Sequence, residues 1–245
     1  MGRKDKDQKA GSLFLIPSSL GEKSISSIWP EDNIEIVNHL DVFIVENLRT
    51  ARRFLRHAGY ARPFEDVRFH EIGKHSDAQQ YPSFLKEAAD GRDTGLLSEA
   101  GSPCIADPGH TIVALAHEKG IRVKPLVGPN SILLALMASG LNGQEFSFHG
   151  YLPVQEKQRS YKIREIEGES RRCGGSTQIF METPYRNMAM AESLIKECRT
   201  DTLLCIAADL CMETEYIKTL TIAGWKKAGL PDLHKRPAMF LIMGI

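Results

Sequence analysis

The hydrophobic positions of this chain fall into short runs that are separated by polar segments containing glycine and proline. Apolar runs rich in β-branched residues predict strands. In the first half of the chain they occupy residues 13–16, 41–46, 94–97 and 121–126. Apolar residues at helical spacing occupy 48–58, 112–118 and 132–138. Because strands and helices alternate, we expect an α/β domain built on a parallel sheet.

The second half repeats the alternation with different connections. Strands are predicted at 178–181, 203–208 and 239–243, with a helix at 189–198. The segment 142–153 mixes glycine, proline and aromatic residues, which is typical of a linker. We therefore expect a disordered tail at 1–11, a first α/β domain at 12–141, a linker at 142–153 and a second α/β domain at 154–245.

Composition and charge exclude several classes of protein. The chain has 245 residues, of which 42% are hydrophobic and 25% charged, values near the average of folded proteins. Basic and acidic residues number 31 each, so an affinity for nucleic acid has to come from a local patch. The five cysteines lack CxxC spacing, and the longest apolar run is too short to span a membrane. These features favour a cytoplasmic protein with reduced thiols.

Common catalytic and nucleotide-binding motifs are absent from the sequence. It contains no GxxxxGK[ST], GxGxxG, GxSxG or HExxH pattern. Its eight histidines never pair at metal-ligand spacing, so we expect no metal site.

Two turns that are rich in small residues follow predicted strands. The first, SEAGSPCIADPG at 98–109, contains two glycines and two prolines. Such a turn allows a ligand close to the backbone, but composition alone fits a packing turn equally well. The second, VGPNS at 127–131, follows the next strand and leads into an apolar helix. Two such turns at one sheet edge favour a ligand site.

The order of PSSLGE, VENLR, SEAGSPCIADPG, KPLVGPNS, ASGL and FSFHGYLP resembles the tetrapyrrole methylase family. Within the family the pattern is most similar to the ribosomal small subunit methyltransferase I branch, which 2′-O-methylates ribosomal RNA. The resemblance extends from about residue 13 to the C-terminus. It implies a homodimer of two-domain chains, each with a parallel N-terminal sheet, a mixed C-terminal sheet and S-adenosylmethionine bound between the domains.

The resemblance also implies roles for individual residues. In the first domain, the cofactor is expected to contact Ala100, Gly101, Ser102, Pro103, Ile105, Ser131 and Ile132. In the second domain it is expected to contact Met181, Glu182, Asp209, Leu210, Pro237, Ala238 and Met239. Read without the family, each of these is a strand-end residue that could serve packing alone.

The chain departs from the branch where the acceptor is expected to bind. The branch has PTPIGN where this chain has residues 17–22, PSSLGE, and AEDTR where it has 45–49, VENLR. Its RELTK becomes residues 209–213, DLCME, and its KGE becomes 235–237, KRP. The sequence therefore predicts methyl transfer more firmly than a particular acceptor.

The chemistry requires few catalytic side chains, since the reacting groups mainly have to be aligned. If a ribose hydroxyl is the acceptor, Glu46 is the candidate base, with Arg49 beside it. Alternatively, Glu46 forms an ion pair with Arg49 or Arg186 that holds the cleft together. Pro17, Ser18 and Arg186 are expected to face the acceptor.

A basic cluster at helical spacing follows Glu46. It contains Arg49, Arg52, Arg53 and Arg56, and is either a phosphate-binding face or a solvated helix surface. We thus expect ribosomal RNA as the partner. A methylase of a tetrapyrrole-like small molecule and a cofactor-binding protein without catalysis remain as alternatives.

Overall fold

A computed structural model describes residues 10–21, 28–73 and 76–245 of the chain. The chain forms two compact units, Met1–Asn130 and Ser131–Ile245. Each unit contains one five-stranded sheet in its described residues, and the units are considered separately below.

The N-terminal unit is built on a parallel sheet with the strand order β3-β2-β4-β1-β5. Its strands are β1 (Ser12–Ile16), β2 (Val42–Val45), β3 (Arg68–Glu71), β4 (Thr94–Leu97) and β5 (Arg122–Pro125). Its helices are α1 (Glu31–His39), α2 (Leu48–His57), α3 (Tyr81–Phe84), α4 (Lys86–Ala89) and α5 (Gly109–Glu118), with 3-10 turns at Phe64–Asp66 and Ala78–Gln80. The crossover helices explain why the strands can run parallel.

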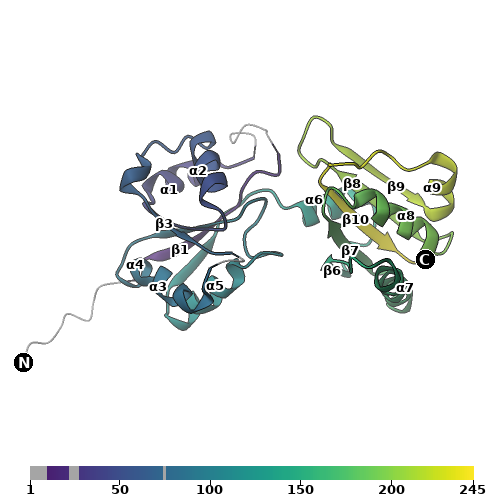
Figure 1. The fold of residues 1–245 in the computed structure, drawn as a ribbon, viewed down its shortest axis with the longest axis horizontal. Coiled ribbons are helices and arrows are strands. Elements are labelled where there is room, and N and C mark those ends of the chain that lie inside the picture. The colour runs from purple at the N-terminus through teal and green to yellow at the C-terminus, as the bar shows by residue number, and fades with distance from the viewer. Residues whose placement is uncertain (1–9, 22–27, 74–75) are drawn as a thin grey trace, which may run out of the picture. The chain divides into compact units, whose positions relative to one another are not determined.

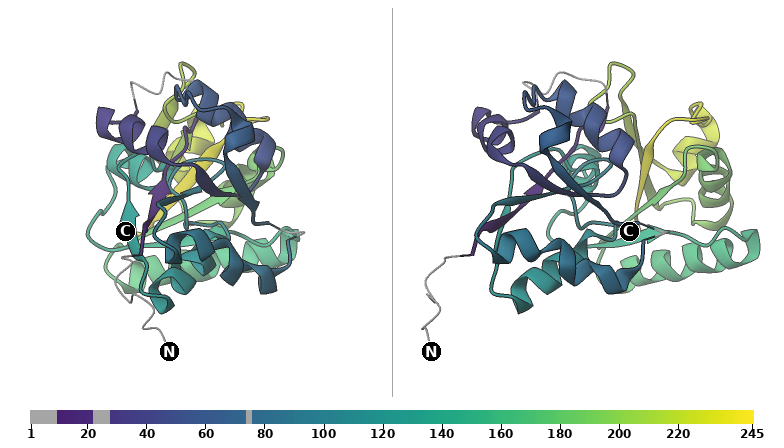
Figure 2. Two further views of the ribbon diagram at one scale, coloured as in Figure 1. Left: turned by 90° about the vertical axis from the view of Figure 1, so that its left-hand side faces the viewer. Right: turned by 60° about the vertical axis from the view of Figure 1, so that its left-hand side comes forward.

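Helices cover both faces of this sheet, as Figures 1 and 2 show. On one face, α1 and α2 pack through Val37 and Leu55 against Phe43. On the other, α3, α4 and α5 pack against Ile44 and Leu96. The central strands β2 and β4 are buried on both faces, which accounts for their continuous apolar runs.

The C-terminal unit is built on a mixed sheet with the order β6-β7-β10-β8-β9. Its strands are β6 (Phe146–Tyr151), β7 (Thr177–Glu182), β8 (Leu203–Ala208), β9 (Tyr216–Thr221) and β10 (Ala238–Met243). Strands β6 and β7 are parallel, and the other neighbours are antiparallel. Its helices are α6 (Ser131–Ser139), α7 (Glu156–Arg172), α8 (Asn187–Glu197) and α9 (Ile222–Ala228).

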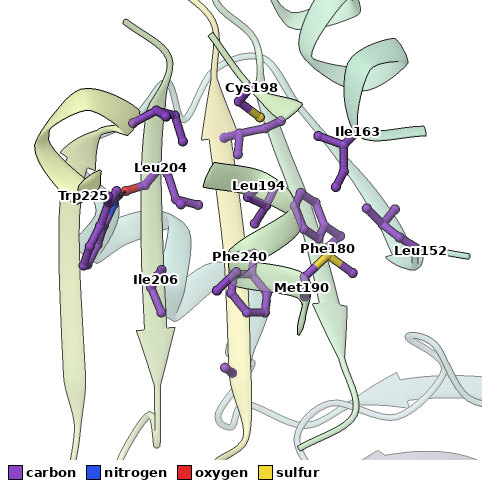
Figure 3. Close-up of a cluster of buried hydrophobic side chains, with 14 of the residues drawn as sticks. Leu152, Ile163, Phe180, Met190, Leu194, Cys198, Leu204, Ile206, Trp225 and Phe240 are labelled. Atoms are coloured by element: carbon purple, nitrogen blue, oxygen red, sulfur yellow. Dashed lines mark hydrogen bonds between the residues drawn. The ribbon is translucent and has the colours of Figure 1, made fainter. Parts of the chain in front are cut away.

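Helices α7, α8 and α9 cover one face of the mixed sheet and α6 contacts the other. Figure 3 shows the core on the first face, where Phe180 and Phe240 stack 5.9 Å apart. Trp225 of α9 is buried there and donates from Nε1 to the Leu204 carbonyl at 2.9 Å. The buried side chains fix the position of the strands that carry the candidate residues.

The architecture of a parallel and a mixed sheet is confirmed, but several predicted boundaries change. The units divide at Asn130 and Ser131, not at 141, because the helix α6 packs on the C-terminal sheet. The expected linker at 142–153 contains β6, which pairs with β7 through its backbone. Most of the expected tail at 1–11 lies outside the described residues, whereas Gly11 donates to the Ala88 carbonyl. No helix of the described residues is long and apolar enough to cross a membrane.

Candidate cofactor and substrate site

The carboxyl edge of the N-terminal sheet brings its candidate turns together. Parallel register aligns Ile16 of β1 and Val45 of β2 with Leu97 of β4, and Leu15 with Pro125 of β5. The residues that follow these strands therefore leave the sheet at one edge. They include Pro17 and Ser18, Glu46, the turn 98–109 and the turn 127–130.

Hydrogen bonds join the turn after β1 to the turn after β4. Ser18 and Gly101 form an isolated antiparallel bridge, with N···O distances of 2.8 and 3.2 Å. The buried Ser18 hydroxyl donates to the Ser98 carbonyl, and Ser98 Oγ donates to the Gly101 carbonyl at 2.7 Å. Gly101 has φ +68°, a conformation that glycine adopts without strain. Ser18, predicted to face the acceptor, thus uses its side chain to hold the turn.

The turn after β5 approaches the same place. A Cβ atom added to Gly128 would lie 2.2 Å from Cγ of the buried Pro17, so only glycine fits this contact. The Asn33 side chain donates to the Val127 carbonyl at 2.6 Å, and Ser102 Oγ donates to the Pro129 carbonyl at 3.4 Å. The candidate residue Ser102 therefore links the two turns that the sequence singled out.

Within the turn 98–109, buried and exposed candidates alternate. Gly101 and Pro103 are buried, Ser102 is half-buried, and Ala100 and Ile105 are exposed. Because a large apolar side chain in water is unfavourable, the exposed Ile105 suits a position that a ligand covers. Asp107 supports the turn from inside by accepting from the backbone N–H groups of Cys104 and Gly109.

An acidic group lies at this edge. Glu46 accepts from the Glu99 backbone N–H at 3.0 Å, and Thr50 donates to the Glu99 carboxylate at 3.2 Å. Burial raises the pKa of Glu46, and the charges of Asp107 and Glu99 raise it further, although the Glu99 N–H opposes them. Burial also raises the pKa of Asp107. None of these three carboxylates has a salt bridge among the described residues.

The predicted ion pair of Glu46 with Arg49 is thus not seen in the described part of the chain. Within its own unit, Arg186 donates to Glu182 at 2.6 Å, four residues earlier, and its pairing with Glu46 stays a prediction. Arg49 lies on the exposed first turn of α2, which is capped by Asn47.

The four arginines of α2 divide into two pairs. Arg52 lies 5.2 Å from the ring centre of Phe69, and Arg56 lies 3.9 Å from that of Phe64. Arg56 also donates to the Tyr60 and Arg62 carbonyls. These two side chains therefore stabilise the end of α2 by cation–π contacts. Arg49 and Arg53 are exposed, with no salt bridge among the residues that the structure describes.

In the C-terminal unit, strand register gathers the remaining candidates. Ala238, the first residue of β10, is paired with Glu182 of β7 and with Ala208 of β8, while Met239 faces Met181. Pro237, Asp209 and Leu210 flank these pairs in the sequence, and the Asp209 N–H donates to the Pro237 carbonyl at 2.9 Å. Ser131 and Ile132 begin α6, on which Ile132 is buried. The structure thus brings seven of the nine cofactor candidates in this unit to one sheet edge.

The same edge carries a network of charged groups that the sequence did not indicate. Arg236 donates to Asp209 and to the Thr214 carbonyl at 2.7 Å each, and to the Asp232 carbonyl at 3.0 Å. Asp209 adopts φ +51° within this network. A surface depression beside it is lined by Asp209, Glu213, Thr214, Glu215, Tyr216, Asp232 and Arg236.

Some residues of the site gave no signal in the sequence. Glu99 and Asp107 lie inside the predicted turn, but only their distance from Glu46 makes them part of an acidic group. Arg236 lies among other polar residues in the segment before β10, so nothing in the sequence distinguishes it. No group of three or more histidine, cysteine or acidic residues that could hold a metal occurs among the described residues.

Solved structures share this arrangement of a parallel and a mixed sheet. The methyltransferase CobJ superposes with a TM-score of 0.61 at 16% identity, over 96% of this chain and 94% of its own. A uroporphyrin-III C-methyltransferase from Thermus thermophilus, complexed with S-adenyl homocysteine, gives 0.57 at 14% identity over 95% and 97%. At these identities the likeness shows the fold of this class of methyltransferases.

Sequence comparison defines the family. The family model of tetrapyrrole (corrin/porphyrin) methylases matches residues 32–224, and the chain belongs to this family of S-adenosylmethionine-dependent methyltransferases. The chain is 29% identical to the ribosomal RNA small subunit methyltransferase I of Escherichia coli O157:H7 over 86% of its length and 69% of that relative. It is 32% identical to the protein of that name from Halalkalibacterium halodurans, over 72% of the chain and 56% of the relative.

The residues at the N-terminal edge fit such a cofactor. S-adenosylmethionine carries positive charge on its sulfonium and its amino group. The acidic group of Glu46, Glu99 and Asp107 lacks a salt-bridging cation in the described part of the chain, so positive charge beside it is favourable. At the C-terminal edge, Arg186 Nε and Asn187 Oδ1 are buried without a hydrogen-bond partner among the described residues, which leaves capacity for a polar ligand.

Proposed function

We propose that this protein transfers a methyl group from S-adenosylmethionine to a ribose 2′-hydroxyl of small-subunit ribosomal RNA. The observation that carries the proposal is the similarity to relatives named ribosomal RNA small subunit methyltransferase I, which extends over 86% of the chain for the first of them. Family membership supports the methyl donor, and the exposed arginines of α2 support an RNA acceptor.

Bound S-adenosylmethionine supplies an electrophilic methyl group. In the N-terminal unit, Ala100, Gly101, Ser102, Pro103 and Ile105 are proposed to bind it, since the bridge between Ser18 and Gly101 fixes their turn before a ligand arrives. Such pre-organisation reduces the entropy that binding costs.

In the C-terminal unit, the proposed cofactor-binding residues follow the strand ends described above: Met181, Glu182, Asp209, Leu210, Pro237, Ala238 and Met239, with Ser131 and Ile132 at the start of α6. Ala238 and Met239 are buried in the sheet, so their backbone groups and the edge of the Met239 side chain are the parts expected to contact a ligand.

Glu46 is proposed as the base that accepts the proton of the ribose hydroxyl. A carboxylate whose pKa is raised by burial is a stronger base than an exposed one, and the absence of a salt bridge in the described residues leaves it available. Arg49, one turn further on, is proposed to orient the acceptor. Arg53 shares its exposure and is proposed to contact phosphate, as are Arg52 and Arg56 through guanidinium edges not covered by their aromatic neighbours.

Pro17, Ser18 and Arg186 are proposed to border the acceptor site. Pro17 and Ser18 act through the shape of their turn, since both are buried. Acting on ribosomal RNA, the protein is expected to work in the cytoplasm, and a homodimer is proposed from the family resemblance.

The test uses purified protein, labelled S-adenosylmethionine and small ribosomal subunits from a strain that lacks the corresponding methylation. We expect label in the RNA and, after nuclease digestion, a 2′-O-methylnucleoside. The variant Glu46→Gln should lose most of this activity, whereas Glu31→Gln, which changes an exposed carboxylate on α1, should not. Cofactor binding in calorimetry without transfer to RNA would contradict the acceptor and would favour a small-molecule methylase or a protein without catalysis.

A further inference from the structure

Two exposed aromatic side chains meet on the C-terminal unit outside the proposed cofactor residues. Tyr185 follows β7, and His234 lies in the segment before β10. Their ring centres are 6.5 Å apart and their planes are inclined at 73°. The Tyr185 side chain is 74% exposed. A large aromatic ring held in water at a defined position is typical of a binding surface.

Backbone contacts hold the two segments together. The Lys235 N–H donates to the Pro184 carbonyl at 3.1 Å, and the buried Asn187 side chain donates to the Arg236 carbonyl at 2.6 Å. Within the first segment, the Arg186 N–H donates to the Thr183 carbonyl at 2.9 Å. The backbones that carry the two rings are therefore held together before a ligand binds, which reduces the conformational entropy that binding costs.

A cation and a third aromatic residue border the pair. Arg186 forms a salt bridge with Glu182. The hydrogen bond within this pair is the main cause of the raised pKa of Arg186, and the nearby Tyr151 phenol also raises it. Tyr151 ends β6 and is 55% exposed. Because β6 and β7 are parallel, Tyr151 lies at the edge where Tyr185 follows β7.

We propose that Tyr185 and His234, with Arg186 and Tyr151 beside them, form a stacking surface for an unpaired base of a single-stranded RNA. Aromatic rings and guanidinium groups bind RNA bases by stacking on their faces. The Asp232 carboxylate, which accepts from the His234 backbone N–H at 2.9 Å, disfavours phosphate at this position, so the surface contacts the base and not the backbone. The inference rests on the proposed RNA acceptor and deepens it, because it requires the RNA to present an unpaired nucleotide.

The experiment measures binding of a short fluorescein-labelled single-stranded RNA by anisotropy, with a duplex of the same sequence in parallel. Tyr185→Ala should weaken binding of the single strand by roughly five- to a hundredfold. Tyr185→Phe keeps the aromatic ring and should bind the single-stranded RNA as tightly as the wild type does. The matched control is Tyr161→Ala on α7, a 70% exposed tyrosine that should have no effect.

Salt distinguishes stacking from charge. The loss of RNA affinity caused by Tyr185→Ala should persist at high salt. The loss of RNA affinity caused by Arg53→Ala should shrink, because salt screens phosphate contacts. Equal binding by the wild type and Tyr185→Ala would overturn the inference, as would equal losses for the Tyr185 and Tyr161 variants. The proposed function is decided separately, by methyl transfer from labelled S-adenosylmethionine to small ribosomal subunits with the wild type, so its failure and the failure of this inference are distinguishable.

Discussion

Substitution of Gly128 by alanine should disturb the candidate cofactor turn through a single added carbon. That carbon would lie 2.2 Å from Pro17 Cγ and 2.6 Å from Pro17 Cβ. Since carbon atoms in contact are about 3.5–4.0 Å apart, the overlap is roughly 1.3 Å or more. Pro17 is buried and its ring cannot rotate away, so the backbone of one turn must move.

The cost follows from that displacement. Forcing one extra carbon into a packed position destabilises a protein by about 1–3 kcal/mol. A shift of about 1 Å in a group that positions reactants can reduce the rate roughly a hundredfold. Because the Pro17 carbonyl also accepts from Trp29 Nε1 at 2.9 Å, the core of the unit opposes a movement of β1. We therefore expect Gly128→Ala to lose more cofactor affinity and activity than stability.

The assay combines urea unfolding with calorimetry of S-adenosylmethionine binding. Gly143→Ala is the control, since its added carbon would have no atom within 4 Å. Wild-type affinity together with wild-type stability in Gly128→Ala would refute the close approach of the two turns.

Three further predictions concern charge and the core. In the wild type, the methylation rate should fall as pH decreases through the raised pKa of Glu46, and Glu46→Gln should remove this acidic limb of the pH–rate profile. An acidic limb that survives the substitution would exclude Glu46 as the base. Burial acts to raise the pKa of Glu87, but the hydrogen bond from Arg68 outweighs it, and the pKa is lowered overall. The ionised Glu87 should therefore stabilise the fold fully above its usual pKa of 4.5, and this stabilisation should be lost as pH falls through the lowered pKa. Glu87→Gln should therefore lower the free energy of unfolding by about 1 kcal/mol at neutral pH, a modest value because the partner Arg68 is exposed. Urea unfolding in acid should show no difference between the variant and the wild type, and a difference that persists there would contradict the role of the ion pair. Trp225→Phe should cost about 2–3 kcal/mol in urea unfolding, because it leaves a gap in the core and removes the hydrogen bond from Nε1 to the Leu204 carbonyl; a loss below 0.5 kcal/mol, roughly the level of a surface change, would contradict this.

Elements buried on both faces were the easiest to predict from sequence. Strand β4 was predicted with its exact bounds, and β8 likewise, because continuous apolar runs of strand length leave few alternatives. Strand β3 was missed, since its residues RFHE are exposed or half-buried at the sheet edge and show no apolar run. The long helix α7 was missed for a similar reason. It contains the apolar residues Ile163 and Ile166 among many charged ones, so its buried face is narrow.

The site was predictable in its small-residue turns and not in its charged contacts. The turn 98–109 could be recognised because glycine permits backbone conformations that other residues disfavour and proline fixes φ, both of which are local effects. The salt-bridge partners of Glu182 and Asp209 could not be recognised from the sequence. Arg186 is only four residues from Glu182, but the pair between Arg236 and Asp209 depends on β10 lying between β7 and β8. Such contacts follow from tertiary topology and leave no pattern along the chain.

The bridge between Ser18 and Gly101 makes two turns that are more than eighty residues apart in sequence a single thermodynamic unit. Changes on its two sides should not be additive: after Ser98→Ala has removed one hydrogen bond of the bridge, Ser18→Ala should cost less than it does in the wild type. A substitution in the first turn is consequently tolerated better when the second turn has also changed, so the two segments are expected to diverge together among relatives of this protein.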